Sequence, residues 1–344
     1  MPFINASDTL WESLLSETPH DFYHLPGFTQ IEAELLGGEA LGWYSEEGKS
    51  RHLIPLVKRP VGQHYLHDLV SPYGYPGMLS NQKLSADEAA ALFNRFHFEA
   101  KQEGYVSSFV RLNPISNAWD FKETGEQQTK PFSQVFHGQT VSVNLKPSLK
   151  TIRQNFSENH KRNLKTLKHQ GYRLDFNEWA YLGEFIEVYR QTMTRKSAYP
   201  YYFFPSGYFE NLKELLGERL VFVTITDKDK RLVSGGLFTH FDKIMQYHLG
   251  ATLTEALEHS PSKMMMDESI VYGKKHGAEM LHVGGGFSAN TSDGLFRFKK
   301  GFGSHLHPFS TLRFIHHPDI YEKLVQDKNR KIFDASFFPE YRNS

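Results

Sequence analysis

A lysine set among aromatic side chains is the feature of this sequence best suited to do chemistry. Lys299 stands in the stretch DGLFRFKKGF, with Phe298 directly before it and Phe302 three residues after it. A cation held against apolar rings in a partly dry site stabilises an oxyanion more strongly than it would in water. The alternative is that Lys299 and Lys300 are solvated on a surface helix whose phenylalanines pack the core.

Three consecutive glycines, Gly284, Gly285 and Gly286, precede this stretch. They lack the downstream Gly-Lys-Ser/Thr of a phosphate loop and do not fit G-x-G-x-x-G, which argues against a nucleotide-binding loop. Glycines here indicate either a sharp exit of the chain from a strand or a close approach of substrate to the backbone. Asp293 or Ser292 is expected to cap the helix that follows.

A basic segment is the second candidate for binding. Residues 146–173 hold eight Lys and Arg against the single acid Glu158, whereas the whole chain has a net charge of zero. A local positive field of this kind binds phosphates or steers a polyanion. We expect Arg162 to contact such a phosphate. The alternative is an ordinary solvated helix face. A further helix is expected to open with Ser260 as its N-cap and to hold a phosphate through free amides, helped by Lys263.

Candidates for a general base and for a metal site are less specific. His248, Glu268 and Asp68 have the right chemistry for a base, but the sequence does not place them near one another. The best histidine pairs, His305-x-His307 and His316-His317, have no helical histidine partner or carboxylate set, so core or surface histidines are predicted and no metal site. The absence of cysteine excludes disulfides, Cys-ligated zinc, iron–sulfur clusters and thiol nucleophiles.

Length and composition favour a globular protein. A chain of 344 residues with 23% charged and 39% hydrophobic residues can form two domains of ordinary size. No run approaches the roughly 18–20 apolar residues that span a bilayer. The first residues lack the basic start and apolar stretch of a secretory signal, so a cytoplasmic location is expected.

The chain runs twice through a similar order of elements. Turn residues and hydrophobic periodicity predict the following segments: strands at 40–46, 51–60, 68–70, 105–112, 141–145, 219–227, 231–252, 280–286 and 305–316, and helices at 85–104, 148–156, 159–171, 179–195, 205–217, 260–277 and 293–302. A strand meander followed by helix, strand, helix and strand is the order of a GNAT-type acyltransferase fold. We therefore predict an α/β (α+β) protein of two tandem GNAT-like domains, 1–135 and 136–344, each a mixed, mostly antiparallel sheet flanked by helices.

Four segments in order resemble the FemABX-like, or BioF2-like, branch of the GNAT superfamily. They are QNFSENHKRNLKTLKHQGY, VYRQTMTRKSAYPYYFFPSGYFENL, the long stretch from YHLGATLTEALEHSPSKMMM to LHVGGG, and DGLFRFKKGF, which together span residues 154–302. The first half of the chain contributes only DLVSPYGYPG and its order of elements.

The resemblance implies transfer of an aminoacyl or acyl group to an amine. Fem proteins use aminoacyl-tRNA and GNAT relatives use acyl-CoA, so no tightly bound cofactor is expected. By the resemblance Lys299 stabilises the oxyanion with Phe298 beside it, and Arg195 binds substrate phosphates. Tyr201 and Tyr202, in the aromatic run that follows Arg195, are expected to form a pocket wall; the alternative is a tight loop that packs on the core. His248 and Gly284–Gly286 are expected to lie at the substrate.

Two departures from the family pattern bear on the substrates. The GNAT coenzyme A loop carries glycines, whereas LEHSPSKMMMDE at 257–268 has none, which favours aminoacyl-tRNA over acyl-CoA as donor. Fem enzymes often carry a lysine in the first N-terminal helix, where this chain has Glu32 and Glu34. An acceptor other than the usual nucleotide-linked muropeptide is therefore expected.

Three functions remain open. The first is a Fem-like acyltransferase acting on an amine of a cell-envelope precursor, either peptidoglycan or a surface glycan, at the inner face of the membrane with peripheral membrane contact. The second is an acyl-CoA-dependent N-acyltransferase acting on a polysaccharide amino sugar. The third is a non-catalytic relative that binds envelope precursors or RNA.

Overall fold

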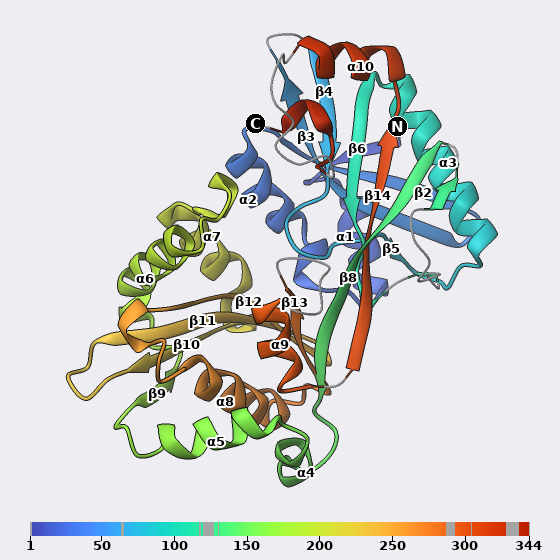
Figure 1. The fold of residues 1–344 in the computed structure, drawn as a ribbon. Helices are drawn as coiled ribbons and strands as arrows, with labels where there is room; N and C mark the ends of the chain where they lie inside the picture. Colours follow the sequence, from blue (N-terminus) through green and yellow to red (C-terminus); the bar gives the residue numbers. More distant parts are fainter. Residues whose placement is uncertain are drawn as a thin grey trace. The chain divides into compact units, whose positions relative to one another are not determined.

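The chain forms two compact units in a computed structural model that describes residues 2–62, 65–116, 118–119, 127–129, 131–286, 293–303, 305–327 and 337–343 (Figure 1). The first unit comprises residues 1–138 and 308–344, and the second comprises residues 139–307. The chain passes from the first unit to the second within strand β8 (Phe132–Asn144) and returns within β14 (His305–Ile315).

The first unit is a mixed sheet with helices on both faces. Its strands follow the order β1-β2-β3-β4-β6-β14, and every neighbouring pair is antiparallel except β4 and β6. The elements are β1 (Phe3–Asn5), α1 (Thr9–Glu17), η1 (Phe22–His24), α2 (Pro26–Leu36), β2 (Glu39–Glu47), β3 (Ser50–Val61), β4 (Leu66–Val70), β5 (Leu79–Ser80), α3 (Ala86–Gln102), β6 (Tyr105–Arg111), β7 (Gln127–Thr129), α10 (Pro318–Asp327) and η6 (Glu340–Arg342).

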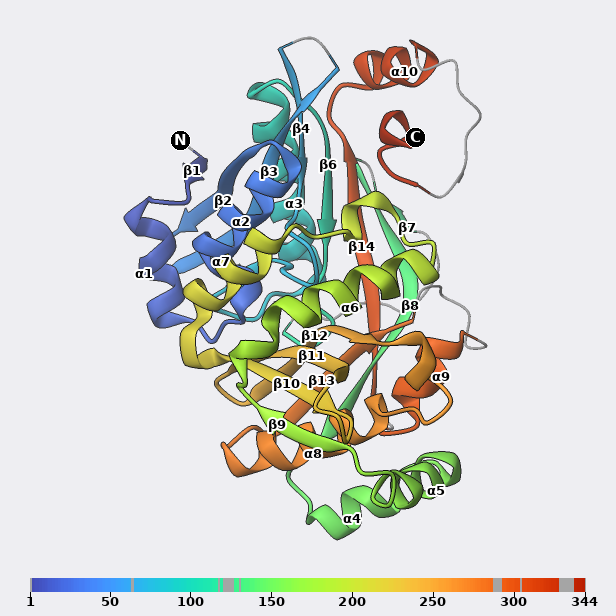
Figure 2. The same cartoon turned by 90° about the vertical axis from the view of Figure 1, so that its left-hand side faces the viewer.

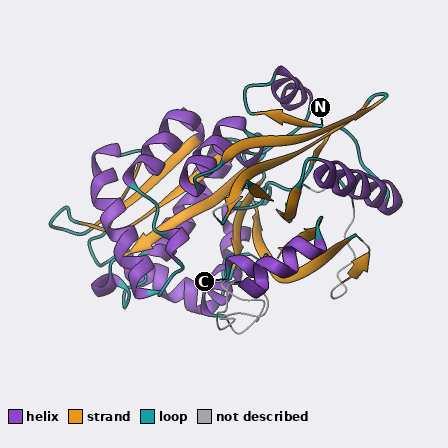
Figure 3. Cartoon of the chain, turned by 90° about the horizontal axis from the view of Figure 1, so that it is seen from above, coloured by secondary structure: helices purple, strands orange, loops and turns teal. Residues whose placement is uncertain are grey.

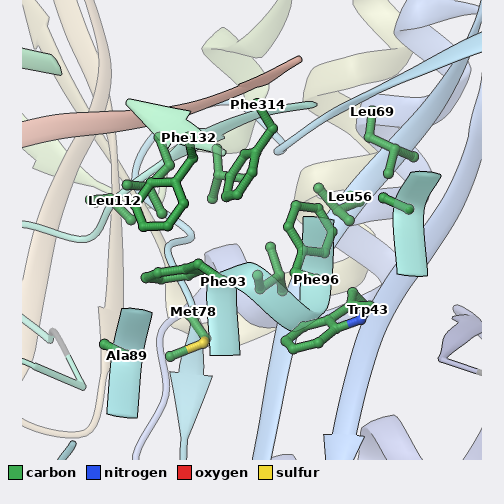
Figure 4. Packing of buried hydrophobic residues seen from close by; sticks show 14 of the residues in the cluster. Trp43, Leu56, Leu69, Met78, Ala89, Phe93, Phe96, Leu112, Phe132 and Phe314 are labelled. Atoms are coloured by element: carbon green, nitrogen blue, oxygen red, sulfur yellow. The ribbon is translucent and has the colours of Figure 1, made fainter. Parts of the chain in front are cut away.

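The two faces of this sheet are covered by different helices. Trp43 of β2 and Phe93 and Phe96 of α3 share a core with Phe132 and Phe314 (Figure 4). On the other face α1 packs so closely that a Cβ added at Gly42 would lie 2.8 Å from the ring of Trp11. Helix α3 begins at the predicted place because the side chain of its N-cap, Ser85, accepts from the Glu88 amide in a capping box.

The second unit is also a mixed sheet, with strand order β8-β13-β12-β11-β10-β9 and one parallel pair, β12 and β13. Its elements are α4 (Leu149–Gln154), α5 (Glu158–Leu167), β9 (Arg173–Phe176), η2 (Trp179–Tyr181), α6 (Leu182–Arg195), η3 (Pro200–Tyr202), α7 (Ser206–Leu216), η4 (Gly217–Arg219), β10 (Leu220–Thr226), β11 (Leu232–Phe241), β12 (Ile244–Thr252), η5 (Thr254–Ala256), α8 (Ser262–Lys275), β13 (Met280–Gly285) and α9 (Gly294–Lys300).

Helices α6 and α8 lie on opposite faces of this second sheet (Figure 2). Gly235 and Gly236 are successive residues of β11, and their side-chain directions therefore point to opposite faces. A Cβ at Gly235 would meet Phe185 of α6, and one at Gly236 would meet Met265 of α8. Both glycines leave room for helices to approach the sheet closely.

The same order of elements occurs in both units, as the sequence pattern indicated. A three-stranded meander (β2-β3-β4 or β10-β11-β12) is followed by a helix (α3 or α8) and by a strand parallel to the last one of the meander (β6 or β13). The predicted class, a mixed α/β protein, is confirmed (Figure 3).

The C-terminal limit of the second unit differs from the predicted domain 136–344. Residues 308–344 group with the first unit because β14 pairs with β6, from Thr311↔Arg111 to Ile315↔Ser107. Helix α10 follows β14, and its Tyr321 packs against Val106. A continuous domain could not be distinguished in the sequence from one whose last strand completes the other sheet.

The predicted N-cap at Ser260 is wrong. Helix α8 begins at Ser262 after Pro261, and no side chain caps it. Ser260 takes a left-handed conformation with φ of 56°, and its hydroxyl donates to the Leu257 carbonyl at 3.4 Å. Its side chain therefore serves the preceding turn.

Asp68, a candidate base by type, is a structural carboxylate of the first unit. It is fully buried and pairs with Arg59 at 2.9 Å and with Arg342 at 3.1 Å. The Tyr341 hydroxyl donates to it at 2.9 Å. Asp68 thus holds the C-terminal turn against β4 and β3. No helix in the described part of the chain is long and apolar enough to cross a membrane.

We predict that Asp68→Asn lowers the free energy of unfolding by about 3 kcal/mol, because it leaves two arginines without their buried counter-charge. Urea unfolding followed by tryptophan fluorescence measures this, since Trp11, Trp43 and Trp119 all belong to the first unit. Glu103→Gln, at an exposed position of the same unit, is the control. Equal stability of the two variants would contradict the structural role of Asp68.

Candidate functional site

The hydrogen-bonded pairing of strands β12 and β13 ends after three residue pairs. They are paired at Ile244↔Met280, Met245↔Leu281 and Gln246↔His282, and a 2.8 Å hydrogen bond joins the side chains of the last pair. Beyond that point β12 continues to Thr252 and β13 to Gly285, each paired to a different neighbour. We call the diverging segments, residues 247–252 and 283–286, the fork.

A bulge in each strand explains the divergence. In β12, Leu249 and Tyr247 face consecutive residues of β11, so His248 is the extra residue. In β13, Gly284 and His282 face consecutive residues of β8, so Val283 is the extra one. A bulge bends its strand and increases the local twist, and two bulges side by side turn the strands away from each other.

The three glycines have separate structural tasks at the fork. Gly284 has φ of 75°, in the left-handed region where glycine is favoured. Gly285 pairs with Thr140 and presents its carbonyl to Lys299. A Cβ at Gly286 would lie 2.8 Å from Cγ of Asp293 and 3.0 Å from Cβ of Phe296. Together they let α9 pack tightly on the end of β13; substrate contact at these glycines stays a prediction.

Helix α9 starts at the predicted cap. The Asp293 carboxylate accepts from the Phe296 amide at 2.9 Å, while Ser292, the other predicted cap, lies outside the described residues. The helix lies against β13. Of its two adjacent lysines, Lys300 is exposed and Lys299 is only 8% exposed. The alternative that both lysines are solvated is therefore wrong for Lys299.

The Lys299 ammonium contacts both arms of the fork. Nζ donates to the Gly285 carbonyl at 2.7 Å on β13, and it lies 5.7 Å from the ring centroid of Tyr247 on β12. An ammonium over an aromatic face is attracted by the ring quadrupole. Burial, followed by the positive charge of Lys196, lowers the pKa of Lys299 to about 7, against an opposing effect of Asp293. Near neutral pH this amine can therefore both hold and release a proton.

Phe298 contacts His160, which lies on α5. Its ring centroid lies 5.4 Å from that of Phe302 and 5.6 Å from that of His160. Its carbonyl oxygen also accepts from His160 at 2.8 Å. The structure thus places Phe298 at the junction of α9 and α5.

Arg195 is fastened to the end of the β12 arm. It donates to the Thr254 hydroxyl at 2.8 Å and to the Thr252 carbonyl at 3.1 Å. The hydroxyl of Thr192, one turn earlier, donates to the same carbonyl at 3.2 Å. These bonds bring the C-terminal end of α6, including Lys196, close enough to the fork to influence Lys299. Sequence reasoning missed Lys196, whose only signal was its place beside Arg195.

The aromatic run after α6 connects to the fork through Tyr208. Tyr201 and Tyr202 are half-buried, and Tyr201 lies 5.8 Å from Phe204, measured between ring centroids. Phe204 stacks on Tyr208 at 4.1 Å, and the Tyr208 hydroxyl lies 3.0 Å from Nε2 of His248. Burial lowers the pKa of His248 to about 3, so its ring is neutral and only weakly basic.

Two amides at the start of α8 are engaged within their own turn, and phosphate binding there stays a prediction. The amides of Lys263 and Met264 already donate to the carbonyls of Ser260 and Pro261, at 3.0 and 2.9 Å. Lys263 is 5% exposed, and its Nζ lies 2.9 Å from the side-chain oxygen of Asn163 once that amide is turned to accept. Arg162 by contrast is exposed on α5.

The remaining candidates are the histidine pairs and Glu268. In the described residues no group of three or more His, Asp or Glu side chains is arranged to hold a metal ion. His307 bonds to Ser142 and His316 to Ser108, each at 2.7 Å. Glu268 is half-buried on α8, where burial and Asp267 raise its pKa.

In the first unit, the parallel strands β4 and β6 stay hydrogen-bonded at the place that corresponds to the fork. Directly after β4, the Ser71 amide donates to the Phe109 carbonyl at 2.8 Å. Arg111 then donates to Ser71 twice, from its amide to Oγ and from its guanidinium to the carbonyl, both at 2.9 Å. The two parallel strands therefore stay joined, and the candidate chemistry lies in the second unit.

The residues that build the fork lie in the part of the chain that matches a known family model. Residues 154–300 match the acetyltransferase (GNAT) domain. The match covers less than half of the chain and shows what this part is similar to. It includes Arg195, both arms of the fork and Lys299.

Solved structures extend the likeness over nearly the whole chain. FemX matches with 14% identity and a TM-score of 0.65, over 94% of this chain and 99% of FemX. L-PGS from Bacillus licheniformis matches with 13% identity and a TM-score of 0.56, over 92% and 94% of the two chains. A tandem GNAT protein from the clavulanic acid biosynthesis pathway matches with 10% identity and a TM-score of 0.50, over 92% and 98%.

At these identities the likeness establishes the fold. The predicted resemblance to the FemABX-like branch of GNAT proteins is confirmed at that level. No curated protein sequence matches the chain.

We predict that Gly286→Ala destabilises the second unit by about 1–3 kcal/mol, because the new methyl group would push α9 off β13. Gly294→Ala is the matched control, since a Cβ there meets no atom within 4 Å. Thermal unfolding of both variants measures the difference. Equal melting temperatures would show that α9 tolerates displacement.

We predict that Lys196→Met raises the pKa of Lys299 and that Asp293→Asn lowers it, because the first removes a repelling charge and the second an attracting one. Asparagine is also a good N-cap, so the second change preserves the helix start. Competitive labelling of Lys299 with an amine reagent across pH, read by mass spectrometry, measures both. Lys300→Met is the control, and identical titration of Lys299 in all variants would contradict the coupling.

Proposed function

We propose that this protein is an acyltransferase that moves an aminoacyl or acyl group from an activated donor to an amine of a cell-envelope precursor, with Lys299 as the residue that stabilises the developing charge. The observation that carries the proposal is the buried Lys299 ammonium held between the two arms of the fork. The GNAT domain match over residues 154–300 and the FemX-like fold support the reaction class.

The fork offers two strand edges to an extended substrate. Beyond Gln246 and His282 the strands no longer pair with each other, so their facing edges can accept an extended, amide-containing ligand. The reacting carbonyl would lie near Lys299, where the acceptor nitrogen attacks it and a C–N bond forms. The charged ammonium stabilises the tetrahedral oxyanion, the bond to the donor's oxygen or sulfur breaks, and the leaving group takes up a proton.

The pH range of the proposed activity follows from the protonation of Lys299. Its ammonium must be charged to stabilise an oxyanion, while the acceptor amine must be neutral to attack. Activity supported by Lys299 is therefore lost as pH rises through its pKa of about 7. Lys196 and Asp293, which act on that pKa in opposite directions, set the upper edge of the pH range.

Aminoacyl-tRNA is the donor we favour. The segment 257–268, where GNAT proteins place a glycine-rich coenzyme A loop, has no glycine. The amides of Lys263 and Met264, in the first turn of α8, already donate to the carbonyls of Ser260 and Pro261. Exposed basic residues on and directly after α5, namely Arg162, Lys165 and Lys168, offer phosphate contacts of the kind a tRNA end requires.

The acceptor remains an envelope amine of peptidoglycan or a surface glycan. Where Fem enzymes often carry a lysine, Glu32 is fully buried and accepts from the Tyr73 amide at 3.0 Å. A nucleotide diphosphate gains nothing from this carboxylate, which disfavours the usual nucleotide-linked muropeptide. Such an acceptor would be met at the inner face of the membrane. We further propose that both units are GNAT-like, the second carrying the transfer site.

Two alternatives stay open. An acyl-CoA N-acyltransferase acting on a polysaccharide amino sugar would use the same fork and the same lysine. A non-catalytic relative would bind an envelope precursor or RNA without transfer.

We predict that Lys299→Ala lowers kcat by about a hundredfold to a thousandfold, as the loss of one oxyanion-stabilising donor does in other enzymes. The neighbouring exposed residue supplies the control, since Lys300→Ala should keep full turnover. The assay offers labelled aminoacyl-tRNA and, separately, labelled acetyl-CoA, together with an envelope-precursor extract.

Each outcome of this assay is decisive for one alternative. Transfer from acetyl-CoA alone would overturn the tRNA proposal and favour the amino-sugar N-acyltransferase. Transfer from neither donor would favour the binding relative. Full turnover of Lys299→Ala would remove the oxyanion role.

A further inference from the structure

Helix α5 is bonded to the C-terminal end of α9, the helix that carries Lys299. His160 of α5 donates from Nε2 to the Phe298 carbonyl at 2.8 Å. The Ser157 amide, at the N-cap of α5, donates to the Gly301 carbonyl at 2.9 Å. The Phe298 carbonyl also accepts from the Gly301 amide at 3.2 Å, so His160 supplies a second hydrogen bond to it. Ser157 satisfies the carbonyl of Gly301, the C-cap of α9.

The fit between His160 and α9 is close. A Cβ at Gly301 would lie 2.4 Å from Nε2 of His160, so only glycine admits the imidazole here. The imidazole centroid lies 4.3 Å from the ring centroid of Phe302. Although it belongs to the basic segment, His160 is only 4% exposed. A solvated helix face therefore does not account for this residue.

The His160 imidazole is neutral and carries its proton on Nε2. A carbonyl oxygen only accepts, so the atom facing Phe298 must be the donor. Nδ1 is buried and has no hydrogen-bond partner among the described residues. Burial and the charge of Lys263 lower the pKa of His160 against the effect of its bond to Phe298. A second proton would be buried, unpaired and beside a cation.

The bond to Phe298 fixes the peptide group that leads into Lys299. Helix α9 has only seven residues, Gly294–Lys300, and a helix this short is not stable without tertiary support. Its start is held by Asp293 and its end by His160 and Ser157. The Phe298 carbonyl belongs to the peptide unit joined to the Lys299 nitrogen, so holding it orients the Lys299 side chain.

We propose that His160 is a positioning residue for Lys299: its hydrogen bond to the Phe298 carbonyl holds the ammonium between the two arms of the fork. This inference rests on the proposed transfer function for its catalytic consequence. The placement of Lys299 itself can be measured without any reaction.

The test is His160→Phe, which keeps an aromatic ring against Phe302 and removes the donor. We expect kcat to fall by about tenfold to a hundredfold, since small misplacements of a catalytic group cost this much, while the donor KM changes less than about twofold. We also expect the pKa of Lys299, measured by competitive amine labelling, to rise towards that of an ordinary lysine as its ammonium regains water. His160→Gln retains an N–H donor and should recover part of both properties.

His169→Phe is the matched control, because His169 is exposed just after the same helix. A folded His160→Phe protein with unchanged kcat and unchanged Lys299 titration would overturn the proposal. A second result would also overturn it: His160→Gln lowers the melting temperature as His160→Phe does and restores neither kcat nor the titration of Lys299. That result would mark a purely structural histidine. If the wild-type protein transfers from neither donor, the proposed function fails, while the labelling result still decides the role of His160.

Discussion

The parting of β12 and β13 after Gln246 and His282 is the constraint on which the rest of the second unit depends. Parallel neighbours normally continue their ladder to the end of the shorter strand, but a bulge at His248 and another at Val283 bend the two strands apart. The strand ends that this leaves unpaired with each other are covered by other elements. Helix α6 reaches the tip of β12 through Arg195 and Thr192, and α9 packs on the tip of β13 where Gly286 leaves room.

Lys299 turns this geometry into a chemical site. A lysine in a largely water-free place favours its neutral form, and a second cation nearby strengthens that preference. The Gly285 carbonyl, the Tyr247 ring and Asp293 favour the charged form. The balance leaves a pKa near 7, where a small change in surroundings decides the charge. Such an amine suits a reaction in which negative charge develops on a carbonyl oxygen and is lost again when the tetrahedral intermediate breaks down.

The two units follow the same order of elements but differ at the equivalent point. In the first, Ser71 and Arg111 continue the hydrogen bonding between the parallel strands, and the carboxylate of Asp68 ties the C-terminal turn to the sheet. In the second, the strands part and a lysine enters. The same order of elements thus ends in joined strands in one unit and in diverging strands in the other, and the difference arises from a few residues at the ends of two strands.

The sequence by itself determined the elements of the repeated order and the family resemblance, and it singled out Lys299 as a candidate, because hydrophobic periodicity, capping residues and a lysine among phenylalanines are local patterns. It also offered Asp293 as one of two possible caps. Only the tertiary structure decided what depends on distant neighbours. Ser260 turned out to serve a turn, Lys263 to be buried, and residues 308–344 to complete the other unit. The tasks of the three glycines, the influence of Lys196 on Lys299 and the bond from His160 to Phe298 join residues that are far apart along the chain. No local pattern records such pairings, since they arise only when the strands diverge and the helices pack around them.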